Sequence, residues 1–125
     1  MLQKLLLIAL AGALGTLARY ALGNAVQRVS GGGLPWGTLL VNVLGCFLFG
    51  LVWTLADERL LISSDARVIM LGGFMGAFTT FSTFIFETGS MVRNAELVMA
   101  TGNVLVQTLV GLVFLFAGIM FGRVL

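Results

Sequence analysis

The sequence predicts an all-α membrane protein with four transmembrane helices, and composition and segment length carry that prediction. Hydrophobic residues make up 59% of the 125 residues and charged residues only 10%, with a mean hydropathy of +1.10. Soluble domains contain roughly 25% charged residues, so this chain has too few polar side chains to cover a soluble core. Crossing a bilayer takes about 20 apolar residues. The single expected domain, residues 1–125, has four such spans, at about residues 5–26, 37–56, 68–86 and 97–122.

The first span begins like a signal peptide, with Lys4 before a leucine-rich stretch. Apolar sequence resumes directly after Arg19, so we interpret this segment as a retained helix. The second span follows Pro35, a residue that suits a helix start, and Trp36 and Trp53 suit the two membrane interfaces. Both segments are therefore expected to cross the membrane.

The third span has sharp ends at Arg67 and Glu87 and contains the most unusual run, residues 72–84. This run has no charge but is rich in glycines, hydroxyls and phenylalanines. Glycine weakens a helix, and hydroxyls need partners that lipid cannot supply. We expect a helix break near Gly76, which would free backbone carbonyls that can bind a cation. The alternative is a continuous helix with small residues at a tight crossing.

The fourth span lies between Glu96 and Arg123 and carries two amides, Asn103 and Gln107, four residues apart. Thr38 and Asn42 have the same spacing in the second span. Residues four apart share one face of a helix, so each pair forms a polar stripe. Such side chains often do no more than join helices. Together with the third span, however, the two stripes predict one polar route through the membrane.

The third span contributes Phe81 and Phe84 on one face, with Ser82 and Thr83 beside them. Amides and hydroxyls offer hydrogen-bond donors, and phenyl rings present positively polarised edges. No acidic residue lies in the middle of any span. Donors without carboxylates favour a small anion, although amides and hydroxyls also accept hydrogen bonds.

Positive charges are divided almost equally between the two membrane faces. One face has four, and the other has three if Arg19 reaches that side. The first group is Lys4, Arg59, Arg67 and Arg123, and the second is Arg19, Arg28 and Arg93. Orientation follows this bias, so the count predicts insertion both ways and an antiparallel dimer. It is equally compatible with one fixed orientation and cytoplasmic termini.

The composition also excludes several classes of protein. Cys46 is the only cysteine and there is no histidine, which argues against a transition-metal site and against a nucleophile–base pair. We therefore expect no enzyme. The net charge of +2 comes without a basic cluster, so we expect no nucleic-acid partner.

The run 76–84 followed by Glu87 closely resembles the signature of the Fluc (CrcB-type) family of fluoride channels. Arg19–Tyr20 in the first span and residues 36–42 at the start of the second support the resemblance, which covers essentially the whole chain. Two positions depart from the pattern: Ile85 stands where serine is frequent, and Gly111 where a hydroxyl occurs.

The resemblance implies a dual-topology, antiparallel homodimer in the plasma membrane that lets fluoride leave the cell passively and so reduces fluoride toxicity. It implies a broken third helix, a structural sodium ion held by the backbone carbonyls of Gly76 and Thr79, and Arg19 near an aqueous vestibule. The pathway residues it implies, together with the polar stripes, are Thr38, Asn42, Phe81, Ser82, Thr83, Phe84, Asn103 and Gln107.

Two other functions compete with this one. A small dual-topology, proton-coupled multidrug-type exporter also has about four spans, but it needs an acidic residue inside a span, whereas Asp57 and Glu58 lie in an expected loop. An accessory membrane subunit would explain the polar stripes as contacts between helices, without transport.

Overall fold

The computed structural model describes all 125 residues and is entirely helical. Its elements are α1 (Leu2–Ser30), α2 (Trp36–Trp53), η1 (Thr54–Glu58), α3 (Ser64–Arg67), η2 (Val68–Met75), α4 (Gly76–Phe78), α5 (Phe81–Arg93) and α6 (Leu97–Val124). The π-helical segments η1 and η2 continue their neighbours, giving four helices long and apolar enough to cross a membrane, Leu2–Ser30, Trp36–Glu58, Ser64–Arg93 and Leu97–Val124. The prediction of four helical spans is confirmed. The expected end of the third span at Glu87 is wrong, because α5 continues to Arg93 and Glu87 lies within the helix.

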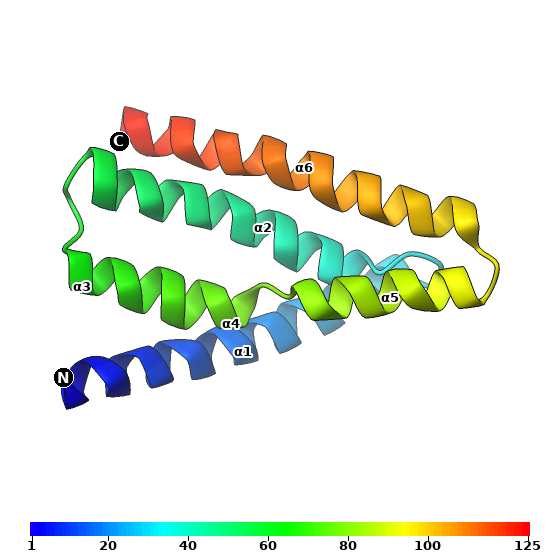
Figure 1. Ribbon diagram of the computed structural model, residues 1–125, viewed down its shortest axis with the longest axis horizontal. Helices are drawn as coiled ribbons and strands as arrows, with labels where there is room; N and C mark the ends of the chain where they lie inside the picture. The colour runs from blue at the N-terminus through cyan, green and yellow to red at the C-terminus, as the bar shows by residue number, and fades with distance from the viewer.

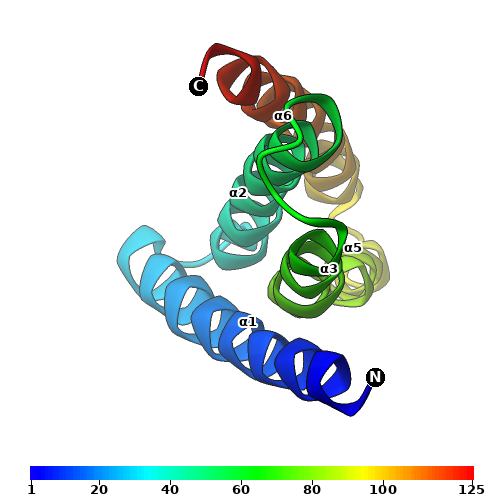
Figure 2. The ribbon, with the colours of Figure 1, turned by 90° about the vertical axis from the view of Figure 1, so that its left-hand side faces the viewer.

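Both termini lie at one end of the bundle, and α2 runs through its middle (Figure 1). α2 packs most extensively against α6, whereas α1 packs against η2, α2 and α4. Viewed from the terminal end, α1 and α6 lie on opposite sides of α2 (Figure 2). Only 21 of the 125 residues are buried, so most apolar side chains face outward, where lipid or another chain can cover them.

Glycines allow the closest helix crossings. A Cβ atom added to Gly15 of α1 would collide with the carbonyl oxygen of Phe74 in η2. A Cβ atom added to Gly118 of α6 would collide in the same way with the carbonyl oxygen of Phe47 in α2. These contacts between backbones replace the large side chains that separate helices in soluble proteins.

Two residues with extended backbone separate α4 from α5. Thr79 has φ −83° and ψ 159°, and Thr80 has φ −149° and ψ 106°. The sequence predicts a helix break near Gly76, whereas Gly76 itself is helical, with φ −60° and ψ −32°. The extended residues begin three positions later, because hydrogen bonds from Thr80 N–H to Asn42 and from Thr83 N–H to the Thr80 hydroxyl replace the helical hydrogen bonds there.

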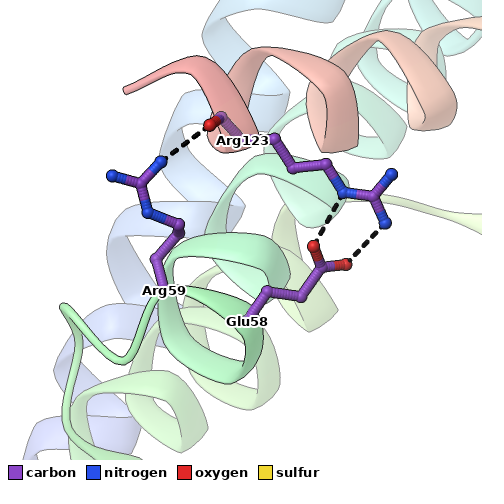
Figure 3. A network of polar contacts seen from close by, with 3 residues as sticks. All are labelled: Glu58, Arg59 and Arg123. Atoms are coloured by element: carbon purple, nitrogen blue, oxygen red, sulfur yellow. Dashed lines mark hydrogen bonds and ion pairs between the residues drawn. The ribbon is translucent and has the colours of Figure 1, made fainter.

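The end that carries both termini is fastened by ion pairs between helices. Arg123 of α6 makes two hydrogen bonds to Glu58 of η1, of 2.7 and 2.9 Å, while Arg59 donates to the Arg123 carbonyl at 2.7 Å (Figure 3). Two further pairs, Arg67–Asp57 and Lys4–Asp65, each have a 2.7 Å contact. Asp57 and Glu58, expected in a loop, lie instead in the last turn of the second helix, in η1, and all three acidic residues at this end are paired with cations.

Candidate functional site

Two cavities lie on either side of the extended segment, and Thr80 lines both. The Arg19 cavity, of about 640 Å³, lies among α1, α2 and α5 and includes Arg19, Thr38, Thr83 and Glu87 in its lining. The Phe81 cavity, of about 340 Å³, lies among α2, α5 and α6. Its lining includes Asn42, Phe81, Phe84 and Gln107. The residues expected to form one route therefore lie around two neighbouring spaces.

The Arg19 cavity is lined by one guanidinium, that of Arg19, and by two carboxylates, those of Glu87 in α5 and of Glu96 at the start of α6. The Thr38 hydroxyl donates to Glu87 Oε1 at 2.7 Å. The second oxygen, Glu87 Oε2, is buried and has no hydrogen-bond partner. Arg19 is half-buried and makes no ion pair with Glu87, so the cavity is lined by charges of both signs that remain apart.

The Phe81 cavity contains a pair of phenyl rings from the first turn of α5. The rings of Phe81 and Phe84 have centroids 5.8 Å apart and planes inclined by 56°. Phe81 is 74% exposed, whereas Phe84 is 8% exposed. One ring of the pair, that of Phe84, is therefore buried within the chain, and the other, that of Phe81, lies on its surface.

The Asn42 side chain binds the backbone of the extended segment at two points. Its Oδ1 accepts from the Thr80 N–H at 2.9 Å, and its Nδ2 donates to the Thr80 carbonyl at 3.2 Å. The same Nδ2 donates to Gln107 Oε1 at 2.9 Å. An amide has two N–H donors, so both donors of Asn42 are occupied.

These contacts deprive two backbone carbonyls of their helical donors. In a continuous helix, Thr80 N–H would donate to the Gly76 carbonyl and Thr83 N–H to the Thr79 carbonyl. Thr80 N–H donates to Asn42 instead, and Thr83 N–H donates to the Thr80 hydroxyl at 3.3 Å, which caps α5. The carbonyls of Gly76 and Thr79 therefore lack the donors that a regular helix would supply.

A chain of hydrogen bonds leads from Asn42 through α6 and back to α5. Gln107 Nε2 donates to Asn103 Oδ1 at 3.1 Å, and Asn103 Nδ2 donates to the Thr88 hydroxyl at 2.9 Å. Thr88 donates to the Phe84 carbonyl at 2.8 Å. Gln107 is 8% exposed and Asn103 4% exposed. In this series of hydrogen bonds, each side chain from Asn42 onward donates to the next residue.

Two of the predicted residues lie apart from the two cavities. The Ser82 side chain is exposed on α5, makes no hydrogen bond and lines neither space. Asn103 lies behind Gln107 and is absent from the lining of both cavities. The other predicted pathway residues line one cavity or the other.

Sequence reasoning missed the roles of Gln27 and Thr88. Gln27 Nε2 donates to the carbonyls of Gly31 (3.0 Å) and Leu34 (3.2 Å), and its Oε1 accepts from Gly37 N–H at 3.2 Å. It thereby fixes the α1–α2 loop at the rim of the Arg19 cavity. The available signal was a pair of amides, Asn24 and Gln27, three residues apart in the last turns of a long apolar helix. Thr88 carried no comparable signal, because a threonine near a helix end commonly bonds only its own helix.

Comparison with known proteins gives a consistent set of relatives. The family model described as "CrcB-like protein, Camphor Resistance (CrcB)" matches residues 6–119. The chain is 54% identical over 125 residues to the protein of Solidesulfovibrio magneticus named "Fluoride-specific ion channel FluC", with 100% of both chains covered. It is 54% identical, again with 100% of both chains covered, to the protein of the same name from Nitrosococcus oceani. A third relative with this name, from Geobacter sulfurreducens, is 45% identical over 122 residues, 98% of each chain.

Proposed function

The chain belongs to the CrcB-like protein family, and from that membership we propose that it is a fluoride-selective ion channel. Relatives that match it over its full length are named fluoride-specific ion channels. In the cell it would act as a multi-pass protein of the plasma membrane, as a channel and not as an enzyme. It would let fluoride leave passively and so lower its toxic concentration in the cytoplasm.

The observation that carries the proposal is the Phe81 cavity. Phe81 and Phe84 lie there beside the Asn42 amide, in a space without a carboxylate. Fluoride is small and strongly hydrated, so a pathway must replace its water with other donors. Neutral amides, hydroxyls and ring edges in series bind an anion weakly enough for it to leave again. A cationic side chain at this point would hold it longer.

The Arg19 cavity is a suitable vestibule for that path. Thr38 and Thr83 supply hydroxyls along it, and Arg19 supplies a positive charge that attracts anions from water. Thr80 lines both cavities, so a path that used both would run past this residue. Ser82, exposed next to Phe81, would extend the polar lining once a second chain covers this face.

We propose that the second chain is an inverted copy in an antiparallel homodimer. The Phe81 ring is 74% exposed on a single chain, so it cannot line an enclosed path by itself. Gly72 and Gly76 are also exposed, and no atom lies within 4 Å of a Cβ added at Gly72, which suits close contact with another helix. The even distribution of positive charges is compatible with copies inserted in both orientations.

A structural sodium ion fits the backbone between α4 and α5. The donor set is chemically appropriate, because sodium binds oxygen ligands and the carbonyls of Gly76 and Thr79 have lost their helical donors. Two such carbonyls from each copy would hold the ion at the centre of the dimer. When bound, it would supply positive charge that holds the extended segments of the two copies together.

Fluoride efflux from liposomes tests the proposed function. Purified protein should release fluoride far faster than chloride, without a proton gradient, and loss of sodium should lower the dimer fraction measured in detergent. Proton-coupled uptake of a cationic dye without fluoride efflux would favour the exporter. Absence of both activities would favour the accessory subunit.

A further inference from the structure

We propose that Gln107 Oε1 is a resident acceptor that an anion must displace before it can bind the Asn42 amide. The proposal rests on the proposed function for the identity of the anion. Its structural basis is the hydrogen bonding of three side chains, Asn42, Gln107 and Asn103, which would be the same for any small anion.

Asn42 has no free donor for an ion. One N–H contacts the Thr80 carbonyl and the other contacts Gln107 Oε1. The Thr80 contact is one half of a two-point contact, since Asn42 Oδ1 also accepts from Thr80 N–H. Breaking it would expose the backbone of the extended segment, so the bond to Gln107 is the one that an ion can replace at lower cost.

Gln107 lies where such an exchange can occur. Its side chain lines the same cavity as Phe81 and Phe84, next to Asn42. An anion between the rings and the Asn42 amide would therefore occupy the place where the Gln107 oxygen now accepts. The Gln107 oxygen thus resembles the ion in position and in chemistry, as a hydrogen-bond acceptor.

Asn103 keeps the Gln107 amide in this orientation. Gln107 Nε2 donates to Asn103 Oδ1, and the Asn103 amide is itself held by its donation to Thr88. If the Gln107 amide turned over, its N–H groups would face those of Asn42 and its oxygen would face Asn103 Oδ1. Both contacts would then be repulsive. The hydrogen bonds from Gln107 to Asn103 and from Asn103 to Thr88 therefore keep the Gln107 oxygen, an acceptor, and not its N–H groups against Asn42.

The test compares Gln107→Met with Thr101→Val in single-channel recordings at a series of fluoride concentrations. Methionine is similar in length to glutamine but is not a strong acceptor, so the fluoride concentration for half-maximal current should fall roughly five- to ten-fold, the effect of one hydrogen bond. Thr101 is exposed on α6 and makes no side-chain hydrogen bond, so its substitution should leave this value unchanged. Asn103→Leu, which frees the Gln107 amide, should shift it in the same direction by a smaller factor.

Opposite results would overturn the proposal. If Gln107 itself donates to the ion, Gln107→Met should raise the half-maximal concentration. If Gln107 only joins helices, the variant should form fewer channels with an unchanged value. The Asn42 side-chain N–H resonances, measured by NMR without fluoride, separate this idea from the channel function. In Gln107→Met one of them should move to the frequency of a less strongly hydrogen-bonded proton. An unchanged spectrum would refute the hydrogen bond between Asn42 and Gln107, whether or not the protein conducts fluoride.

Discussion

The two halves of the third span differ in what they present to their neighbours: the first presents its backbone, and the second presents its side chains. Before Thr79, η2 and α4 pack against α1 through glycine contacts in which backbone meets backbone. After Thr80, α5 contacts α6 less extensively and directs hydroxyls and phenyl rings towards two cavities. The comparison indicates that the first half is an anchor and the second half a functional surface. Changes in the first should therefore affect folding, and changes in the second should affect transport.

Replacing either phenylalanine of α5 should have the largest effect, on transport. Phe81→Ile and Phe84→Ile remove the ring edges while keeping an apolar side chain, so fluoride efflux from liposomes should fall roughly ten-fold or more. The oligomeric state, measured by size-exclusion chromatography, should be the same as that of the unaltered chain. Normal efflux in both variants would show that α5 is not the functional half.

Gly15→Ala should damage the anchor and so reduce stability. The added methyl group would collide with the Phe74 carbonyl oxygen, which belongs to the backbone and cannot rotate away. Overpacking of this kind costs about 1–3 kcal/mol, which thermal unfolding in detergent can measure. Gly12→Ala is the matched control on the same helix. Its added Cβ atom would lie 3.7 Å from the Gly73 carbonyl oxygen, which is an ordinary van der Waals distance. Equal losses in the two variants would contradict the close crossing.

Thr80→Val tests the boundary between the halves. Valine keeps the shape of threonine but cannot accept from Thr83 N–H, so α5 loses its N-cap. Losing such a cap costs about 1 kcal/mol, and the thermal midpoint should fall accordingly. Ser82→Ala removes a neighbouring hydroxyl that makes no hydrogen bond, and its midpoint should equal that of the unaltered chain.

Arg67→Gln should have the smallest effect. Arg67 pairs with Asp57 at 2.7 Å, and its guanidinium lies 5.3 Å from the centre of the Trp53 ring. The side chains of Arg67 and Asp57 are 32% and 50% exposed, so water screens the pair and its contribution should stay below about 1 kcal/mol. Chemical denaturation should barely distinguish this variant from Arg28→Gln, which changes an exposed arginine without an ion pair. A large difference in stability between the two variants would mean that the Arg67–Asp57 pair helps to hold the first half of the third span in place.

The sequence was sufficient for the spans but not for the contacts between them. Hydropathy located four helices, and the spacing of Asn103 and Gln107 placed both on one face of α6. That this face meets Asn42 depends on how α6 is rotated and shifted relative to α2, and no periodicity within one helix determines that. The extended residues begin at Thr79, three positions after Gly76, for a similar reason. Glycines mark where a helix is weak, but the partner that replaces its hydrogen bonds, Asn42, comes from another helix.

The shared location of the two termini bears on reporter fusions. Because Met1 and Leu125 lie at the same end of the bundle, a fluorescent or enzymatic tag on either terminus samples the same side of the membrane (Figure 1). A tagged population inserted in both orientations would give a partial signal from each side, whichever terminus carries the tag. Such a result would describe a mixture of molecules and should not be taken for incomplete folding.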